Sequence, residues 1–291
     1  MSEVDASVVS IQGLTKSFRT GVTALADIDL EVAPREFVSL IGPSGCGKST
    51  LLRIIGDLVT PTSGTVRVNG KSAHQARVDH DYGIVFQDAV LFDWRTVARN
   101  VALPLELLGW DRGRRKERVA EMLELVELTG FESSRPWQLS GGMQQRVSIA
   151  RALSFDPALL LMDEPFGALD EMTRERLNLE LLEIWEKAES TIVFVTHSIP
   201  EAVFLSTRVV VMSARPGQIS ETIEIDLPYP RNAMTHEAPR FFELVPAVRE
   251  ALAACHGGRT YRDTAPAAEG GLRARSSSRS PRGSAESSAG G

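Results

Sequence analysis

The chain has 291 residues, of which 43% are hydrophobic and 24% charged, the composition of a globular protein with an ample core. Its net charge of −6 gives no electrostatic reason for general binding of nucleic acid. Its two cysteines, Cys46 and Cys255, are too few and too far apart for a disulfide framework, so we expect a reducing compartment. We expect no signal peptide, and no apolar run approaches the roughly 20 residues that span a bilayer.

Short apolar runs alternate with helical patterns from about residue 8 to residue 227. Several runs are apolar at every position, which is typical of strands covered on both faces, as in a parallel sheet between helices. This pattern predicts an α/β fold. The runs that we interpret as strands lie at 37–42, 65–70, 82–87, 158–163, 191–196 and 208–213.

No strong strand pattern is present between residues 88 and 156, where helical periodicity predicts a subdomain inserted into an α/β domain spanning 8–230. A further amphipathic helix is predicted at 177–187. Residues 231–256 are expected to form a helical extension. The Ser-, Gly- and Arg-rich segment 257–291 is expected to be disordered, and its composition favours a solvated tail over one that touches nucleic acid or anionic lipid.

Residues 42–50 read GPSGCGKST, which fits the phosphate-loop pattern G-x-x-x-x-G-K-[ST] between a predicted strand and a predicted helix. The glycines let backbone N–H groups curl around a phosphate, and the helix N-terminus adds a favourable dipole. We predict that Lys48 reaches the β- and γ-phosphates and that the Ser49 hydroxyl binds Mg²⁺. The predicted nucleotide contacts are Gly42, Pro43, Ser44, Gly45, Cys46, Gly47, Lys48, Ser49 and Thr50.

Two adjacent acids, Asp163 and Glu164, stand at the end of the apolar run 158–163. In phosphoryl-transfer enzymes an acid at a strand end supports Mg²⁺, usually through water. Neighbouring side chains can diverge toward different targets where a strand ends. We therefore assign Asp163 to Mg²⁺ and Glu164 to activation of the attacking water as general base, with a solvated strand end as the alternative.

Three further residues are candidates for the same site. His197 ends the run 191–197, and beside a phosphate loop we predict that it meets the γ-phosphate, although a lone histidine is more often structural. Gln87 offers an amide oxygen to Mg²⁺, with a glutamine bonded to the backbone as the alternative. Phe18 is a candidate for stacking on adenine, and a core aromatic is the competing interpretation.

These elements, in this order, resemble the ATP-binding cassette (ABC) ATPase family over residues 8–227. The decisive stretches are GPSGCGKST, Gln87, LSGGMQQR at 139–146, LLLMDEP at 159–165, ALD at 168–170 and His197. The resemblance implies a P-loop NTPase core of the ABC type, with a helical subdomain insert and a small antiparallel β portion. It also implies ATP and Mg²⁺ as cofactors.

In that family two chains dimerise head to tail, and each ATP lies between the phosphate loop of one chain and the LSGG signature of the other. The resemblance therefore assigns Ser140, Gly141, Gly142 and Gln144 to an ATP held by the partner chain. The glycines fit this role because side chains would block a phosphate at a helix N-terminus. Asp170 matches an aspartate of the family that acts across the dimer.

Two positions depart from the usual pattern of the family: Gly167 stands where many members have serine, and Phe18 replaces a more usual tyrosine. Neither departure threatens ATPase function. The stretches at 85–107 and 212–219 look like the ATPases of nitrate, taurine and alkanesulfonate importers, a group that also includes importers of thiamine precursors. Trp94 and its neighbours are the candidate interface with a membrane subunit, unless Trp94 is packed core.

The resemblance implies the ATP-hydrolysing subunit of an ABC importer, bound as a homodimer at the cytoplasmic face of the cell membrane. Its expected partners are transmembrane permease subunits and, indirectly, an extracytoplasmic solute-binding protein, with no nucleic acid. The expected solute is small and resembles nitrate, a sulfonate, taurine or a thiamine precursor. The rivals are a soluble ABC-type ATPase without a link to transport and a module that binds nucleotide without turnover.

Overall fold

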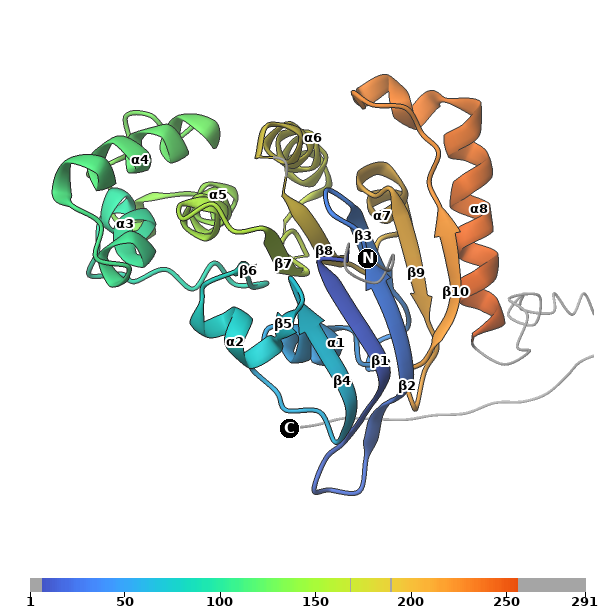
Figure 1. The fold of residues 1–291 in the computed structure, drawn as a ribbon. Coiled ribbons are helices and arrows are strands. Elements are labelled where there is room, and N and C mark those ends of the chain that lie inside the picture. Colours follow the sequence, from blue (N-terminus) through green and yellow to red (C-terminus); the bar gives the residue numbers. More distant parts are fainter. Residues whose placement is uncertain (1–6, 168, 189, 256–291) are drawn as a thin grey trace, which may run out of the picture. The chain divides into compact units, whose positions relative to one another are not determined.

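A computed structural model describes residues 7–167, 169–188 and 190–255. They form two β-sheets with helices packed around them (Figure 1). The first sheet is antiparallel, in the order β2-β1-β4-β5. Its strands are β1 (Val9–Ser17), β2 (Thr23–Val32), β4 (Ser63–Val68) and β5 (Lys71–Ser72).

The second sheet has six strands in the order β10-β9-β3-β8-β7-β6, all parallel except for β10 at one edge. Its strands are β3 (Phe37–Ile41), β6 (Tyr82–Val85), β7 (Leu159–Asp163), β8 (Thr191–Val195), β9 (Arg208–Met212) and β10 (Ile219–Glu224). The chain crosses from β3 to its neighbours β8 and β9 only after long helical excursions. Residues far apart in sequence therefore meet at one edge of this sheet.

The apolar runs of the parallel strands serve two different cores. In β3, Val38 and Leu40 belong to a core shared with the antiparallel sheet and α1 (Lys48–Ile55). Phe37 and Ile41, on the other face, belong to the core shared with the remaining large helices. Because successive side chains of a strand point to opposite faces, only a strand buried on both sides is apolar at every position.

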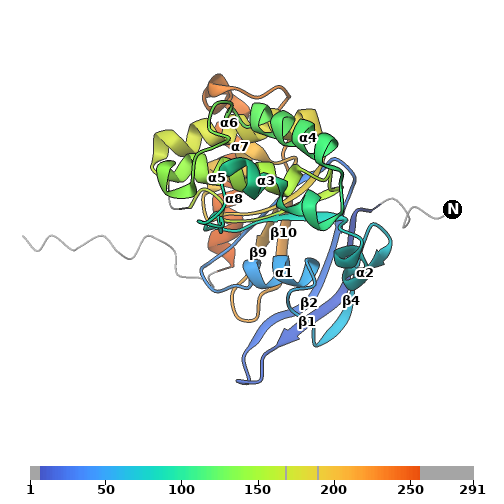
Figure 2. The ribbon, with the colours of Figure 1, turned by 90° about the vertical axis from the view of Figure 1, so that its left-hand side faces the viewer.

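Between β6 and β7 the described chain is helical and contains α3 (Val97–Leu107), α4 (Arg112–Leu125), the 3-10 turn η2 (Pro136–Gln138) and α5 (Gly141–Leu153). The three α-helices pack on one another, as Figure 2 shows in green. The fully buried Asn100 side chain accepts from Phe92 N and donates to the carbonyls of Phe92, Arg95 and Thr96. One buried amide thus holds the segment around Trp94 against α3.

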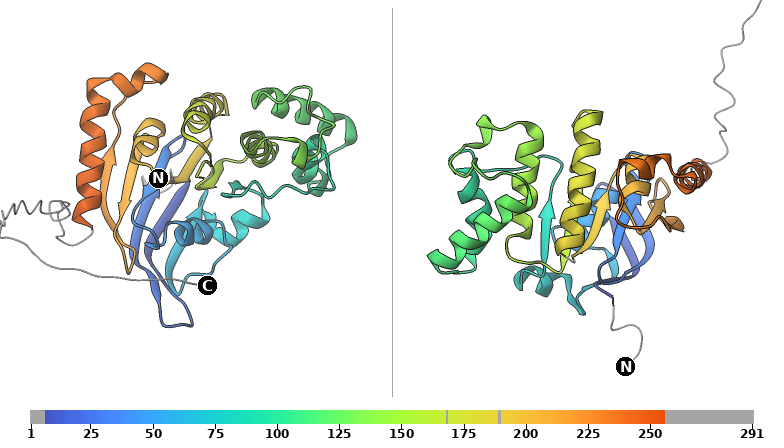
Figure 3. Two further views of the ribbon diagram at one scale, coloured as in Figure 1. Left: turned by 180° about the vertical axis from the view of Figure 1, so that it is seen from behind. Right: turned by 90° about the horizontal axis from the view of Figure 1, so that it is seen from above.

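The remaining helices are α2 (Ala73–Val78), α6 (Glu171–Ala188), α7 (Ile199–Leu205) and α8 (Pro239–Ala254), with the 3-10 turn η3 (Ala233–Glu237) before α8. Helix α8 packs beside α7 and along β9 and β10 (Figure 3). Arg231, only 5% exposed, ties this region together by donating to the carbonyls of Phe204, Ser206 and Leu227. No helix in the described part of the chain is long and apolar enough to cross a membrane.

Candidate nucleotide-binding site

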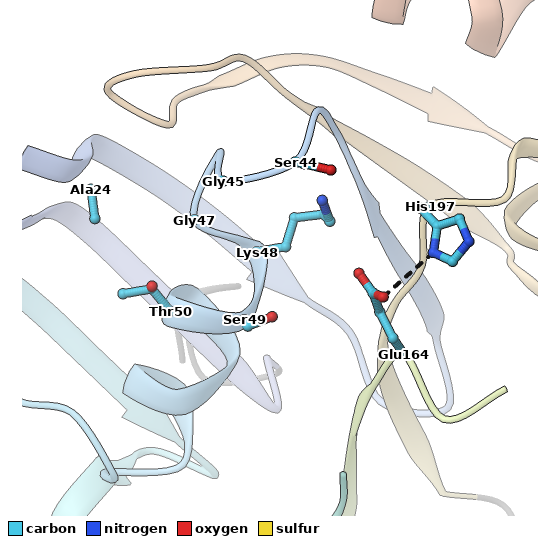
Figure 4. A pocket seen from close by; sticks show the side chains of 9 residues that line it. All are labelled: Ala24, Ser44, Gly45, Gly47, Lys48, Ser49, Thr50, Glu164 and His197. Atoms are coloured by element: carbon cyan, nitrogen blue, oxygen red, sulfur yellow. Dashed lines mark ion pairs between the residues drawn. The ribbon is translucent and has the colours of Figure 1, made fainter. Parts of the chain in front are cut away.

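A cavity of about 350 Å³ lies where β3, β7 and β8 end (Figure 4). The carboxyl ends of parallel strands are the usual ligand-binding edge of such a sheet. The cavity unites the phosphate loop with residues more than a hundred positions later in the chain. Its lining is Ala24, Ser44, Gly45, Gly47, Lys48, Ser49, Thr50, Glu164 and His197.

The loop between β3 and α1 is shaped by glycines that have no room for a side chain. A Cβ on Gly42 would lie 2.6 Å from the Met212 carbonyl oxygen and 2.7 Å from Cys46 Sγ. Gly47 precedes α1 in a left-handed conformation, with φ at 100°. Because the first N–H groups of a helix have no carbonyl partner within it, the start of α1 presents free donors to the cavity.

Lys48 folds back over the loop and is only 6% exposed. Its ammonium donates to the carbonyl oxygens of Gly42, at 2.8 Å, and Pro43, at 3.3 Å. Cys46 is fully buried, with its Sγ 3.8 Å from Lys48 Nζ. The charge of Lys48 is thus held at the wall of the cavity by neutral oxygens, where an anion can compete for it.

Asp163 and Ser49 face each other across the sheet edge. The Ser49 hydroxyl donates to Asp163 Oδ1 at 2.7 Å, and Arg53 lies 3.6 Å from the other carboxylate oxygen. The Asp163 side chain is 8% exposed, so its charge is almost fully enclosed. Ser49 lines the cavity and Asp163 does not, but their hydrogen bond places a hydroxyl and a carboxylate, both hard oxygen donors, side by side.

Glu164 turns away from Asp163 toward His197. Its Oε2 lies 3.4 Å from His197 Nδ1, the contact that is dashed in Figure 4. Glu164 has a φ of 47°, a left-handed conformation that costs a non-glycine residue about 1 kcal/mol. Its backbone is fixed on both sides, because Glu164 N donates to Val195 O and its carbonyl accepts from Gly167 N. The strained turn thus aims two adjacent carboxylates at different targets.

Gln87 and Phe18 do not line this cavity. The Gln87 side chain is exposed and lies beside the loop after β7, where its Nε2 is 3.6 Å from the position of a Cβ on Gly167. Phe18 is 41% exposed, with Lys16 Nζ 5.1 Å from its ring centroid, so it is no core aromatic. Ala24, which does line the cavity, carries no chemical signal that sequence inspection detects.

The LSGG stretch lies apart from the cavity, at the start of α5. The exposed Ser140 is the N-cap of α5, and its hydroxyl accepts from Met143 N at 3.3 Å. The Gln144 amide donates to the carbonyls of Pro136 and Leu139. Asp170 caps α6 in the same way through Thr173, whose hydrogen bonds lower the pKa of the Asp170 carboxyl. None of these residues lines the cavity of its own chain.

Two residues of α5 that the sequence did not single out hold the chain around Gln87. Gln145 is buried and donates to Phe86 O at 3.1 Å. Arg151 donates to Ala89 O at 3.1 Å and to Val90 O at 2.9 Å, and burial lowers the pKa of its guanidinium. A polar residue on the buried side of a helix was the available signal.

A phosphate loop at the end of a buried parallel strand, with two acids ending a neighbouring strand, defines a P-loop ATPase. Comparisons with known proteins identify the family of P-loop ATPases to which the chain belongs. Residues 25–167 match the ABC transporter family. An uncharacterized ABC transporter ATP-binding protein of Methanocaldococcus jannaschii is 51% identical over 232 residues, which cover 79% of this chain and 86% of that protein. The chain belongs to the family of ABC transporter ATP-binding proteins and is an ATPase.

Other relatives and solved structures agree with this membership. The aliphatic sulfonates import ATP-binding protein SsuB of Bacillus cereus is 49% identical, covering 77% of this chain and 88% of SsuB. SsuB of Bacillus subtilis is 47% identical, covering 73% and 82%. A dimeric ABC transporter cassette has a TM-score of 0.66 at 36% identity, covering 75% of this chain and 98% of that one. Its post-hydrolysis state, bound to ADP and Pi, has a TM-score of 0.65 at 34% identity.

Proposed function

We propose that this chain is the ATP-hydrolysing subunit of an ABC importer and acts as a head-to-tail homodimer on separate permease subunits. It would work as a peripheral protein at the cytoplasmic face of the cell membrane. Binding of ATP between two chains would close the dimer, and hydrolysis would reopen it. The observation that carries this proposal is the exposed glycine at the start of α5.

Gly141 has no structural reason to be glycine within a single chain. It is exposed and helical, and among the described residues a Cβ there would meet only Leu169 Cδ2, at an ordinary 3.6 Å. Glycine in a helix costs about 1 kcal/mol relative to alanine. A partner that needs close approach to the free N–H groups of α5, such as the γ-phosphate of an ATP bound to the other chain, supplies the missing reason.

Ser49, which lines the cavity, and Asp163 beside it fit a Mg²⁺ ion. Ser49 and Asp163 already lie within hydrogen-bonding distance of each other, and Mg²⁺ is typically held by one or two protein oxygens together with phosphates and waters. Gln87 is the third candidate ligand. When bound, the ion would neutralise charge on the β- and γ-phosphates.

The chain's own residues would then have separate roles in binding and hydrolysis. Lys48 and the N–H groups at the start of α1 would hold the phosphates, and Phe18 would stack on adenine. Glu164 would accept the proton of the attacking water, while His197, which is 3.4 Å from Glu164, would orient the γ-phosphate and that water. Ser140, Gly141, Gly142, Gln144 and Asp170 of one chain would complete the site of the other.

The helical subdomain, residues 88–156, would receive the permease. A groove of about 1060 Å³ runs between α3 and α4 and the segment that begins at Trp94. Trp94 is 70% exposed, so it is not part of the core. The basic lining residues, Arg95, Arg99, Arg112, Arg115 and Lys116, outnumber the acidic ones, Glu106 and Glu132. A segment of the permease that enters this groove should therefore carry acidic side chains.

Among small solutes we favour a sulfonate, because two of the relatives that cover most of this chain are named for import of aliphatic sulfonates. Recognition of the solute would lie in the permease and in an extracytoplasmic binding protein. Deletion of the gene should abolish growth on an alkanesulfonate as sole sulfur source and leave growth on sulfate intact. Unchanged growth on the sulfonate would exclude this solute but not the ATPase subunit.

The variant Glu164→Gln tests the dimer. It removes the base and keeps the shape of the side chain, so it should form a stable dimer in ATP, visible by size-exclusion chromatography with light scattering, while the wild type returns to monomer. A variant that remains monomeric at saturating ATP would contradict the composite site. If the wild-type chain hydrolyses ATP but co-purifies with no membrane protein, the rival soluble ATPase is correct instead.

A further inference from the structure

The turn that carries His197 is closed by hydrogen bonds among Thr196, Ser198 and Glu201, which we call the clip. The His197 side chain is 58% exposed, and its Nδ1 lies 3.4 Å from Oε2 of Glu164, whose side chain is itself 25% exposed. The aim of His197 therefore depends on its backbone more than on packing of its ring. The residues on either side of it are the ones that fix this backbone.

Three hydrogen bonds close the turn from residue 196 to residue 201. Ser198 N donates to the Thr196 hydroxyl at 3.0 Å, and that hydroxyl donates in turn to a carboxylate oxygen of Glu201. Glu201 N donates to the Ser198 hydroxyl at 3.4 Å. Because the Thr196 hydroxyl both accepts and donates, it links the end of β8 to the first turn of α7 directly around His197.

This clip is buried at a cost in stability. Thr196 is 2% exposed and Glu201 is 6% exposed. Burial raises the pKa of the Glu201 carboxyl, and the Thr196 hydroxyl, Arg174 and His197 act in the opposite direction. Replacing buried polar groups with packed apolar ones is often neutral or stabilising, so stability alone does not account for a carboxyl here.

The same neighbourhood also fixes the chain that follows Glu164. Arg174, on α6, donates to Leu169 O at 2.8 Å and to Phe166 O at 3.4 Å. The positive charge of Arg174 also lowers the pKa of the Glu201 carboxyl, so Arg174 acts on Glu201 while it holds the loop between β7 and α6. The backbone turns that carry Glu164 and His197 are thus braced from one buried region.

We infer that Thr196 and Glu201 are positioning residues that hold the turn of His197 so that its ring faces Glu164 and the γ-phosphate. This inference rests on the proposed role of His197 in hydrolysis. Neither residue lines the cavity, so each acts through His197 and touches no nucleotide itself. A small displacement of a catalytic group lowers the rate strongly even when binding is unaffected.

The test compares, in the full chain, variants that remove a hydrogen-bonding group with variants that keep it. Thr196→Val removes the hydroxyl and should lower kcat for ATP roughly 10- to 100-fold with little change in KM, because the phosphate loop is untouched. Thr196→Ser keeps the hydroxyl and should restore most of the rate. Glu201→Leu should behave like Thr196→Val, whereas Glu201→Gln keeps an acceptor for the Thr196 hydroxyl and should retain more activity.

A double-mutant cycle separates this inference from the proposed function. In the His197→Ala background, Thr196→Val should cause no further loss of kcat. An equal additional loss there, an unchanged kcat for Thr196→Val in the wild type, or failure of Thr196→Ser to restore the rate would overturn the positioning role. A wild-type rate for His197→Ala alone would instead overturn the proposed role of His197.

Discussion

The phosphate loop shows how closely single residues are constrained in this site. Gly42 is enclosed by the carbonyl of Met212 and the sulfur of Cys46, and Lys48 is held by the carbonyls of Gly42 and Pro43. The loop keeps its shape through backbone contacts. The one strongly charged group that it offers to a phosphate is the Lys48 ammonium.

Replacing Lys48 with alanine should weaken ATP binding about 10- to 100-fold, because a hydrogen bond to a charged group contributes about 1.5–3 kcal/mol. Isothermal titration calorimetry with ATP measures this loss. Lys71→Ala is the matched control, since Lys71 pairs with Asp79 and Asp81 on the surface, and its affinity should equal that of the wild type. Equal affinities of the Lys48 variant and the wild type would show that phosphate binds elsewhere.

At the scale of elements, the ends of helices provide residues of the predicted site, whereas their middle parts pack in the core. Helix α5 begins at the exposed Ser140 and Gly141, and its body is buried through Val147 and Ile149. Aromatic side chains connect α7 with α8. His236 stacks on Phe204 at 4.3 Å and meets Phe241 edge-on at 4.9 Å.

Replacing Gly141 with tryptophan should leave ATP binding nearly unchanged and abolish hydrolysis. A Cβ at this exposed position meets Leu169 Cδ2 at an ordinary 3.6 Å, so we expect the fold and Lys48 to be unaffected, but the indole would block the phosphate of the partner's ATP. Binding by titration calorimetry and turnover by phosphate release measure the two effects separately. Loss of ATP binding by the monomer would show that this stretch belongs to the chain's own nucleotide site.

The stability of the chain should fall in weak acid because of His236. Burial lowers the pKa of its imidazole below 6.5, so the unfolded chain takes up a proton before the folded chain does. The contribution of a neutral His236 is therefore present above the unfolded pKa and is lost as the pH falls through the folded pKa. His236→Phe keeps an aromatic ring at this position. When the pH is lowered from about 7.5 to about 5.5, the Tm of this variant should fall less than the Tm of the wild type.

Differential scanning fluorimetry at the two pH values measures this difference. His80→Asn is a suitable control, because His80 is exposed and asparagine tolerates its φ of 62°. If His236→Phe and the wild type lose the same Tm, the ring cluster is not the source of the acid sensitivity.

For the whole molecule, the two halves of the predicted catalytic site lie on different surfaces of one chain. The cavity with Lys48 and Glu164 lies at the carboxyl edge of the parallel sheet (Figure 4), and the start of α5 belongs to the helical segment between β6 and β7. Under the proposed function, a chain built in this way needs a second copy to complete each site.

Mixing two variants that are each impaired tests this directly. In a head-to-tail dimer of a Lys48→Ala chain with a Gly141→Trp chain, one of the two sites has both an intact Lys48 and an intact Gly141. The mixture should therefore regain part of the ATPase rate that each variant lacks alone. The control is a double variant that carries both changes and is measured alone. Its dimers contain no intact site, so it should stay inactive. No recovery in the mixture would contradict the head-to-tail arrangement.

The association with a permease should depend on Trp94. Trp94→Ala removes a large exposed ring at the end of the basic groove and should sharply reduce co-purification with the membrane subunits, as large aromatic side chains often dominate interfaces. Phe242→Ala on α8 is the control, because Phe242 is also exposed, at 64%, but lies outside the groove. Equal loss with both variants would place the interface elsewhere.

Local patterns were sufficient for most elements of the fold. The apolar runs gave β3, β6, β7, β8 and β9 with errors of one or two residues at their ends, where Gly42, Thr196 and Ser213 already leave the strand. Elements without an apolar run were not predicted individually: β10 is a largely exposed edge strand, and α2 and α7 are short. The predicted domain limits, the site residues and the disordered tail stay predictions, and both Ala168 and residues 257–291 lie outside the described chain.

The sequence by itself determined the family, the ATPase class, the phosphate loop and the pair Asp163–Glu164, because each is a short pattern whose chemistry depends on near neighbours. Only the tertiary structure decided which of these groups meet. The order β3-β8-β7 brings Ser49 to Asp163 and His197 to Glu164, and keeps the start of α5 away from them. The buried clip of Thr196 and Glu201 was equally invisible, because burial depends on which helices cover a turn and leaves no mark in the local spacing of residues.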